Sequence, residues 1–209
     1  MSRLPVAPEG WPFIVIPAAA AAGLALVGRR ALAVPFAAAA LASLGFFRDP
    51  EREVPVVPGG VLAPADGRVI AVDELDDPFV GPAVRVAIFL SPLDVHVNRA
   101  PMAALVVGVG YSRGRFVPAY RPDANAVNEH CVLHLQGESA RLTVVQIAGV
   151  VARRIVCRVA PGDKLAAGER FGMIRFGSRT DCCMPRGTDV RVRVGDRVTG
   201  GVTVLGVVA

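Results

Sequence analysis

The stretch A-V-R-V-A-I-F-L-S-P-L-D-V-H-V-N-R-A-P-M-A-A-L-V-V-G-V-G-Y (83–111) shows how most of this 209-residue chain is built. Two runs rich in β-branched residues, 83–89 and 105–111, flank a polar segment that contains Pro92 and Pro101, a pattern typical of strands separated by turns. The same pattern of short β-branched runs separated by glycine and proline continues from residue 48 to the C-terminus. Further strands are predicted at 69–72, 132–135, 142–147, 155–158, 172–174, 182–184, 189–192 and 202–207. These short strands predict a mainly β domain, a β-rich sandwich or partly open barrel.

The N-terminal part has a different composition. Two uncharged stretches, W-P-F-I-V-I-P-A-A-A-A-A-G-L-A-L-V-G (11–28) and A-L-A-V-P-F-A-A-A-A-L-A-S-L-G-F-F (31–47), are separated by Arg29 and Arg30. Each is near the lower limit of the ~17 to 25 residues that a membrane-spanning helix needs. The sequence therefore predicts a membrane-associated helical hairpin over 1–47, followed by a β-rich domain over 48–209.

Other interpretations of the hairpin fit less well. A cleaved signal peptide has one apolar region that ends in a small-residue processing site, and a soluble helical hairpin shows a polar face. Pro17 and Pro35 can kink both helices, so full crossing and a shallow re-entrant course both stay open. Arginines flank both sides of the pair, which leaves its orientation in the membrane open.

The formal net charge of +5 is compatible with an anionic membrane surface. No basic cluster with interleaved aromatic residues occurs, so nucleic acid is not expected as a partner. The four cysteines show no C-x-x-C spacing and lie in apolar runs, which predicts buried, reduced thiols in a cytoplasmic domain. Cys182 and Cys183 are expected to point to opposite faces of a strand.

Three motifs follow one another in the β-rich part: A-P-A-D-G-R (63–68), S-P-L-D-V-H-V-N-R (91–99) and R-F-G-S-R-T-D (175–181). In this order they resemble the motifs of the phosphatidylserine decarboxylases. F-F-R-D-P (46–50) is similar to the segment that joins membrane helices to the catalytic domain of that family, and Asn128-Glu129 is similar to a pair near its substrate site. The resemblance covers essentially the whole chain and points to the short, archaeal-type branch.

The resemblance implies that the chain cuts itself between Gly177 and Ser178, into a β chain (1–177) and an α chain (178–209) that remain together. Attack of the Ser178 hydroxyl on the Gly177 carbonyl gives an ester, and elimination and hydrolysis then leave a pyruvoyl group at residue 178. Glycine leaves the carbonyl open to attack and tolerates a strained backbone. By the resemblance, His96 takes the hydroxyl proton and Asp66 supports the imidazole, as in other activated serines.

Decarboxylation of an amino acid requires an electron sink beside the α-carbon. Pyridoxal phosphate would need a lysine, and the sole lysine, Lys164, lies in a predicted turn, G-D-K (162–164). A pyruvoyl group needs no lysine, so neither pyridoxal phosphate nor a metal is expected.

The resemblance further implies that phosphatidylserine is converted to phosphatidylethanolamine. This would take place at the cell membrane, with the catalytic domain in the cytoplasm and a possible homodimer. Asn128, Glu129 and Arg99 are expected at the substrate. Arg99 replaces a second histidine of the long bacterial members, and F-G-S-R (176–179) replaces their L-G-S-T. His96 would therefore serve both self-cleavage and decarboxylation, or another group takes one of these tasks.

Two other functions are compatible with parts of the sequence. His130 and His134 have the i, i+4 spacing of a helical zinc site, as in a metal hydrolase, but in the predicted strand they would lie ~13 Å apart at ~3.3 Å per residue, too far to share one ion. Valine-rich strands and the Gly-Asp turns at 162–163 and 195–196 would also suit a membrane-tethered, lipoyl-like binding module. The segment 113–128 is predicted to be a loop that can cover a site.

Overall fold

The structure is a computed structural model that describes residues 5–115, 117, 127–149, 154–175 and 178–208. The chain divides into two compact units, 1–51 and 52–209. Most of the predicted loop at 113–128 and Gly177 of the predicted cleavage site lie outside the described residues.

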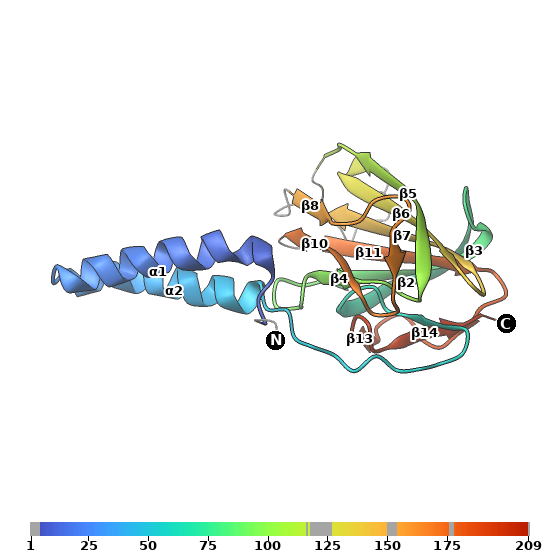
Figure 1. Cartoon of the computed structure of the whole chain (residues 1–209), viewed down its shortest axis with the longest axis horizontal. Coiled ribbons are helices and arrows are strands. Elements are labelled where there is room, and N and C mark those ends of the chain that lie inside the picture. The colour runs from blue at the N-terminus through green and yellow to red at the C-terminus, as the bar shows by residue number, and fades with distance from the viewer. Residues whose placement is uncertain (1–4, 116, 118–126, 150–153, 176–177, 209) are drawn as a thin grey trace. The chain divides into compact units, whose positions relative to one another are not determined.

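The first unit is a pair of helices (Figure 1). A 3-10 turn, Pro8–Gly10, leads into α1 (Trp11–Leu26), and α2 (Arg30–Phe46) packs along it. Pro17 and Pro35 lie inside these helices. The surface of the pair is apolar, with Ile16 and Leu41 each 69% exposed. The helical segment 8–26 is long and apolar enough to cross a membrane, whereas α2 is slightly shorter. The predicted helical hairpin is confirmed, and its apolar surface suits association with a membrane.

The second unit is built on one antiparallel sheet of eight strands (Figure 1). Its order is β13-β2-β3-β11-β7-β6-β5-β9. The bounds are Gly67–Asp77 for β2, Gly81–Leu90 for β3, Ala104–Ser112 for β5, His130–Gly137 for β6, Arg141–Ala148 for β7, Lys164–Leu165 for β9, Ser178–Pro185 for β11 and Arg197–Val198 for β13.

Two three-stranded sheets accompany the main sheet, with the orders β4-β10-β8 and β1-β14-β12. The first contains Val97–Arg99 (β4), Arg170–Arg175 (β10) and Arg154–Cys157 (β8). The second contains Gly60–Leu62 (β1), Val204–Val207 (β14) and Asp189–Val190 (β12). The main sheet curls over them like half a barrel (Figure 1), which confirms the predicted mainly β class.

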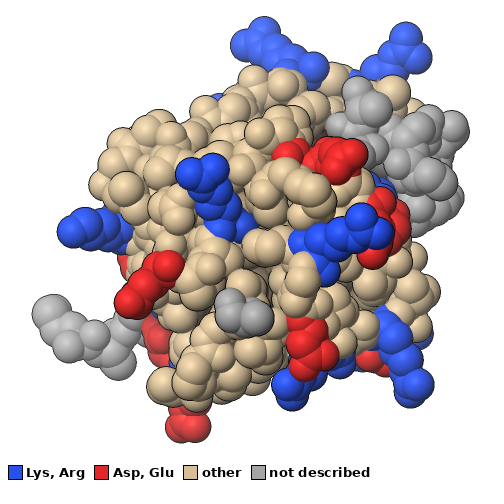
Figure 2. Space-filling model, turned by 90° about the vertical axis from the view of Figure 1, so that its right-hand side faces the viewer, with Lys and Arg blue, Asp and Glu red and all other residues tan. Residues whose placement is uncertain are grey.

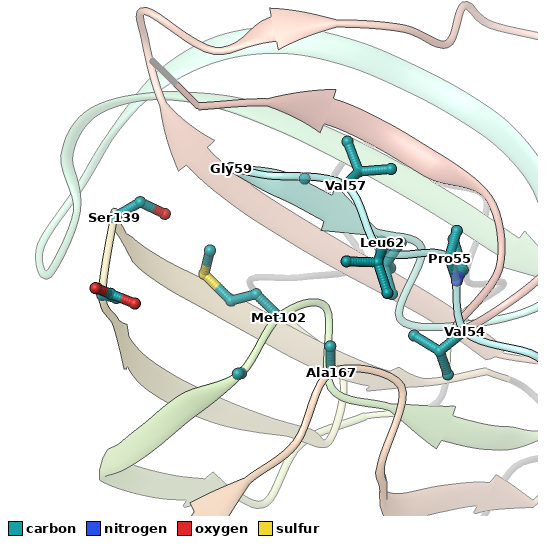
Figure 3. Close-up of a pocket in the computed structure, with 12 residues that line it drawn as sticks. Val54, Pro55, Val57, Gly59, Leu62, Met102, Ser139 and Ala167 are labelled. Carbon is teal, nitrogen blue, oxygen red and sulfur yellow. The ribbon is translucent and has the colours of Figure 1, made fainter.

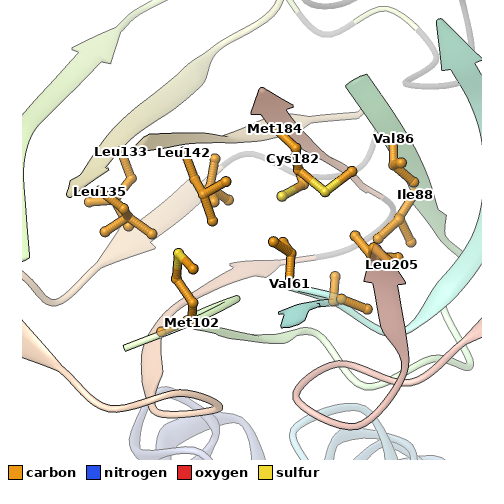
Figure 4. Close-up of a cluster of buried hydrophobic side chains, with 14 of the residues drawn as sticks. Val61, Val86, Ile88, Met102, Leu133, Leu135, Leu142, Cys182, Met184 and Leu205 are labelled. Carbon is orange, nitrogen blue, oxygen red and sulfur yellow. The ribbon is translucent and has the colours of Figure 1, made fainter. Parts of the chain in front are cut away.

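The hydrophobic core lies between the main sheet and the small sheets (Figure 4). Leu133, Leu142 and Cys182 of the main sheet face Val61 and Leu205 of the second small sheet, and all five side chains are buried. Burial of one such side chain contributes about 1.5 to 3 kcal/mol to the free energy of folding. Cys183 lines a hollow on the opposite face of the main sheet, so the predicted opposite orientation of the two neighbouring cysteines is confirmed.

The surface of this unit mixes both signs of charge. On the face shown in Figure 2, lysine and arginine side chains lie among aspartates and glutamates rather than forming a patch of one sign. A second surface feature is an apolar cavity of about 340 Å³ lined by Val54, Leu62, Met102, Ser139 and neighbouring residues (Figure 3). It lies beside the hairpin that joins β6 to β7, at the end of the sheet opposite to Ser178.

Candidate active site

The topology gathers five strand ends at one edge of the main sheet. Neighbouring strands are antiparallel, so β2, β11 and β6 begin where β3 and β7 end. Ser178 is the first residue of β11 and pairs with Leu90 on one side and Ala148 on the other. The backbone at the predicted reactive serine is therefore held between two strands.

The predicted scissile bond lies where the chain passes from one sheet to another. Arg175 ends β10 in a small sheet, and Ser178 begins β11 in the main sheet. Only residues 176 and 177 connect these two strands. A connection this short ties the serine closely to the strands that surround β10.

His96 lies beside the end of β10. The Ile174 N–H donates to the His96 carbonyl at 3.2 Å, and Val97 pairs with Met173. The imidazole is fully buried, and its Nδ1 lies 2.9 Å from the Asp94 carbonyl oxygen. Because a carbonyl only accepts, Nδ1 carries a proton, and the neutral ring then has its lone pair on Nε2. This tautomer suits a proton acceptor.

Asp66 lies in the turn that leads into β2, at the same edge. Its carboxylate accepts two hydrogen bonds from Arg52, at 2.6 and 2.8 Å, and one from the Gly200 N–H at 2.8 Å. The following Gly67 has a φ of +148°, and a Cβ there would lie 2.1 Å from the Phe89 oxygen. Glycine at this position therefore allows the turn to lie close to β3. The described hydrogen-bond partners of the Asp66 carboxylate are Arg52 and the Gly200 N–H.

Asn128 joins the edge from the start of β6. Its Nδ2 donates to the Ala148 oxygen at 2.7 Å and to the Val117 oxygen at 2.8 Å, and its Oδ1 accepts from the Val117 N–H at 2.8 Å. Since Ala148 pairs with Ser178, Asn128 lies one strand away from the predicted reactive residue. Its amide holds the backbone at Val117, in the preceding segment of the chain, against the end of β7.

Glu129 is buried beside Asn128. Its carbonyl accepts from the Ala148 N–H at 2.9 Å, and its carboxylate accepts a short hydrogen bond from the Tyr111 hydroxyl. Partial burial raises the pKa of Tyr111 to about 12, and the hydrogen bond to Glu129 and the negative charge of Glu129 add smaller contributions in the same direction. Tyr111 therefore stays protonated and keeps donating to Glu129 at neutral pH.

Arg99 lies farther from the edge. It pairs with Arg170 at the other end of β10 from Arg175, and its guanidinium donates to the Gly168 oxygen at 3.1 Å. A Cβ at Gly201 would come within 2.8 Å of its Cδ, so the side chain is packed under that turn. The structure does not bring Arg99 to Ser178, and its assignment to the substrate stays a prediction.

His130 and His134 lie on strand β6 rather than on a helix. The Nδ1 of His130 lies 2.8 Å from the Asn128 oxygen, and that of His134 lies 3.2 Å from the Thr143 hydroxyl. Within the described residues, no group of three or more His, Cys, Asp or Glu side chains is placed to hold a metal ion. The strand geometry agrees with the argument against a shared zinc ion.

The comparison with known proteins bears directly on this arrangement. A family model described as phosphatidylserine decarboxylase matches residues 40–206, which include all three motifs and every strand end of the edge. The chain belongs to the phosphatidylserine decarboxylase family. Membership makes it a decarboxylase and sets aside the zinc hydrolase and the lipoyl-like binding module.

Similar proteins cover nearly the whole chain. A protein of Symbiobacterium thermophilum is 47% identical over an alignment of 209 positions, which covers 99% of this chain and 97% of the relative. One of Nitrosomonas europaea is 46% identical over 202 residues, 96% of this chain and 94% of the relative. One of Oleidesulfovibrio alaskensis is 45% identical over 202 residues, 96% and 93% of the two chains. Each is named a phosphatidylserine decarboxylase proenzyme.

Within this decarboxylase fold, the sequence did not single out a pair of buried charges beside Ser178. Arg179 donates to the Asp181 carboxylate at 2.6 and 2.7 Å, and Arg85 of β3 lies 3.7 Å from the same carboxylate. Burial raises the pKa of Asp181, against the opposing effect of the two arginines. The i, i+2 spacing of arginine and aspartate on one face of a strand was the available signal.

The sequence also missed three buried polar residues, Asn98, Gln146 and Thr180. Gln146 was visible as the one amide side chain of the predicted strand 142–147, in which Thr143 is the only other polar residue. A buried polar group in such a place needs hydrogen-bonding partners, which makes it a candidate for a structural or functional contact.

Proposed function

We propose that this chain decarboxylates phosphatidylserine to phosphatidylethanolamine, after cutting itself between Gly177 and Ser178. The observation that carries the proposal is the position of Ser178 at the first residue of β11, paired on both sides. Asp66, His96, Asn128 and Glu129 reach the same edge from distant parts of the sequence, and the family match spans all of them.

Self-cleavage needs a proton acceptor for the serine hydroxyl. The Ser178 oxygen attacks the Gly177 carbonyl carbon, His96 accepts the hydroxyl proton, and the carbon–nitrogen bond breaks as the nitrogen is protonated. The product is an ester between the two residues. Loss of the α-proton of residue 178 then expels the Gly177 carboxylate, and water releases the nitrogen as ammonia. A ketone remains on residue 178.

The two products of cleavage would stay together. Strand β11 belongs to the α chain (178–209), whereas its neighbours β3 and β7 belong to the β chain (1–177). From Arg179 onward, the pairing of β11 with these strands does not depend on the broken peptide bond. Residue 178 therefore remains at the edge, close to the segments that carry His96 and Asn128, just before β4 and β6.

The surroundings of residue 178 fit a pyruvoyl group. When present, this group supplies the electron sink for loss of carbon dioxide. The pairing of Arg179 and Thr180 with β3 and β7 holds residue 178 at the start of the strand, and the buried His96 can hold the proton that the α-carbon of the substrate requires. Asn128 and Glu129 are proposed to contact the substrate. Arg99 is also proposed as a substrate contact, although it lies at the far end of β10, beside Arg170.

The helical unit accounts for access to a lipid. An apolar helix pair would hold the enzyme at the cell membrane, with the catalytic unit in the cytoplasm, so that the phospholipid need not leave the bilayer. A homodimer is part of the same proposal.

Mass spectrometry of freshly made protein tests the proposal. Wild-type protein should give a large fragment and a small fragment instead of one 21.8 kDa chain. The small fragment should react with a carbonyl-trapping hydrazine, and Ser178→Ala should abolish both results. An intact wild-type chain that decarboxylates phosphatidylserine would overturn the self-cleavage mechanism.

A further inference from the structure

Three buried polar side chains lie next to the candidate active site, two residues along the chain from Ser178, Ala148 and His96. Asn98, Gln146 and Thr180 are at most 1% exposed. The Gln146 Nε2 donates to the Asn98 Oδ1 at 2.8 Å, and the Asn98 Nδ2 donates to the Thr180 hydroxyl at 3.2 Å and to the Pro64 oxygen at 3.3 Å. We refer to Asn98, Gln146 and Thr180 as the amide layer.

The amide layer joins two sheets. Asn98 is on β4 of the small sheet, whereas Gln146 and Thr180 are paired neighbours on β7 and β11 of the main sheet. Gly172 of β10 pairs with Asn98, and a Cβ there would lie 3.0 Å from the Gln146 Nε2. Glycine at this position leaves room for the glutamine amide between the sheets.

The position of the layer relates it to the reaction. Thr180 is two residues from Ser178 on the same strand, Gln146 is two residues from Ala148, and Asn98 is two residues from His96. Residues two apart on a strand share a face. The predicted serine begins β11 of the main sheet, whereas its predicted base comes directly before β4 of the small sheet. The amide layer is a direct side-chain link between these two sheets, next to both residues.

Stability alone gives a poor account of this layer. Burying polar groups is unfavourable unless they are hydrogen-bonded, and an apolar layer would fill the same space without that requirement. The Gln146 Oε1 is buried and has no hydrogen-bond partner within the described residues. A buried acceptor of this kind calls for an explanation other than packing.

We infer that Asn98, Gln146 and Thr180 are positioning residues, which set the distance between residue 178 and His96. The inference deepens the proposed function and depends on it. Before cleavage, the layer holds the start of β11 in place for attack by the serine. After cleavage the covalent connection is gone, and the layer still holds the start of β11 against β4. Small misplacements of reacting groups slow reactions by ten- to a hundredfold.

The test compares variants of Thr180 during cell-free synthesis, with the uncleaved and cleaved chains followed by gel over time. Thr180→Val has nearly the same shape but cannot accept from Asn98, so its self-cleavage should be about tenfold slower or more. Thr180→Ser keeps the hydroxyl and should cleave close to the wild-type rate. Gln146→Met, which removes the donor to Asn98 at similar length, should be slowed like Thr180→Val.

A core variant separates positioning from loss of stability. Leu135→Ala opens the core near the other end of the sheet and should lower the melting temperature at least as much as Thr180→Val, while leaving the cleavage rate within about twofold of wild type. Among the cleaved molecules, Thr180→Val should lower kcat with little change in KM.

The outcomes separate the two proposals. Wild-type rates for both Thr180→Val and Gln146→Met, or equal slowing in Leu135→Ala at an equal loss of melting temperature, would overturn the role of the amide layer. A wild-type chain that never cleaves in the same assay would instead overturn the proposed function.

Discussion

At the scale of single residues, Asp66 combines a proposed catalytic role with a described structural one. The ion pair with Arg52 is largely buried, with 8% and 16% of the two side chains exposed. Removing one partner of a buried pair leaves the other charge without compensation, which costs roughly 3 to 5 kcal/mol. A loss of activity in an Asp66 variant therefore does not by itself identify a catalytic carboxylate.

A comparison of Asp66→Asn with Arg52→Met tests this double role. Both should lower the free energy of unfolding by about 3 to 5 kcal/mol, measured by urea denaturation of uncleaved chains that also carry Ser178→Ala. In chains with Ser178 intact, only Asp66→Asn should slow self-cleavage strongly if the carboxylate supports His96. Equal slowing in both variants would instead assign Asp66 to the structure of the turn.

The thiols of Cys131 and Cys157 belong to one small cluster, packed with Ala148 and Ile174. A hydrogen bond from Cys131 lowers the pKa of Cys157, whereas the pKa of Cys131 is raised by the same bond and by burial. Burial also raises the pKa of Cys182 and, to about 12, that of Cys183. Since the thiolate is the reactive form, Cys157 should be the most reactive of the four thiols in the native protein.

Alkylation with iodoacetamide, mapped by mass spectrometry, checks this order. A lowered pKa means that the Cys157 thiolate forms at lower pH. The rate of alkylation of Cys157 should therefore begin to rise below the pH at which an ordinary thiol reacts. Cys131→Ala should move that rise back toward higher pH. Faster labelling of Cys182 than of Cys157 in the folded protein would contradict the expected order.

At the scale of elements, β11 shows how charged residues can be accommodated inside a sheet. Arg179 and Asp181 satisfy each other, and Arg85 of β3 lies close to the same carboxylate. Arg85 is in the proposed β chain and Asp181 in the proposed α chain. This contact would help to hold the two products together after cleavage.

The pH dependence of stability tests the burial of Asp181. Because burial raises its folded-state pKa above the ordinary value of 3.8, the folded state binds the proton more tightly than the unfolded state. Stability from this group is therefore greatest at low pH and falls as pH rises from about 4 through the folded-state pKa. The unfolding free energy of wild type minus that of Asp181→Asn should decrease over this range and then level off. A difference that increases with pH would show that the arginines outweigh burial.

Strand β11 also shows what the sequence could and could not predict. The apolar run 182–184 identified a strand, but its start at Ser178 was hidden because Arg179 and Asp181 read as surface residues. The helices at 11–26 and 30–46 matched the prediction closely because their composition is uniform. Motifs supplied the residue types of the site, whereas the partners Arg52 of Asp66 and Gln146 of Asn98 follow from tertiary packing. Arg52 and Asp66 lie outside the strands, and Asn98 and Gln146 lie in different sheets, so short-range patterns do not encode these contacts.

At the scale of the whole molecule, the proposed substrate is a membrane lipid, and the two units have separate proposed roles: the helical unit binds the membrane and the second unit carries the reaction. The catalytic unit has its own core and its own hydrogen-bonded sheets. The helical unit exposes apolar side chains that are unfavourable in water and favourable in lipid. Membrane binding should therefore be separable from self-cleavage, because Asp66, His96 and Ser178 all lie in the second unit.

A single charged substitution in α1 tests this division. Ile16 is 69% exposed, so Ile16→Asp should leave the fold and the self-cleavage rate unchanged. Insertion of an aspartate into the centre of a bilayer costs about 2.5 to 3.5 kcal/mol, so binding to phosphatidylserine-containing vesicles should weaken by roughly a hundredfold in a co-sedimentation assay. Val194→Asp, at a position 60% exposed on the second unit, is the matched control and should bind like wild type. Equal binding by all three proteins would show that the helix pair does not anchor the enzyme, whereas a shared loss of self-cleavage would show that the two units act together in the reaction.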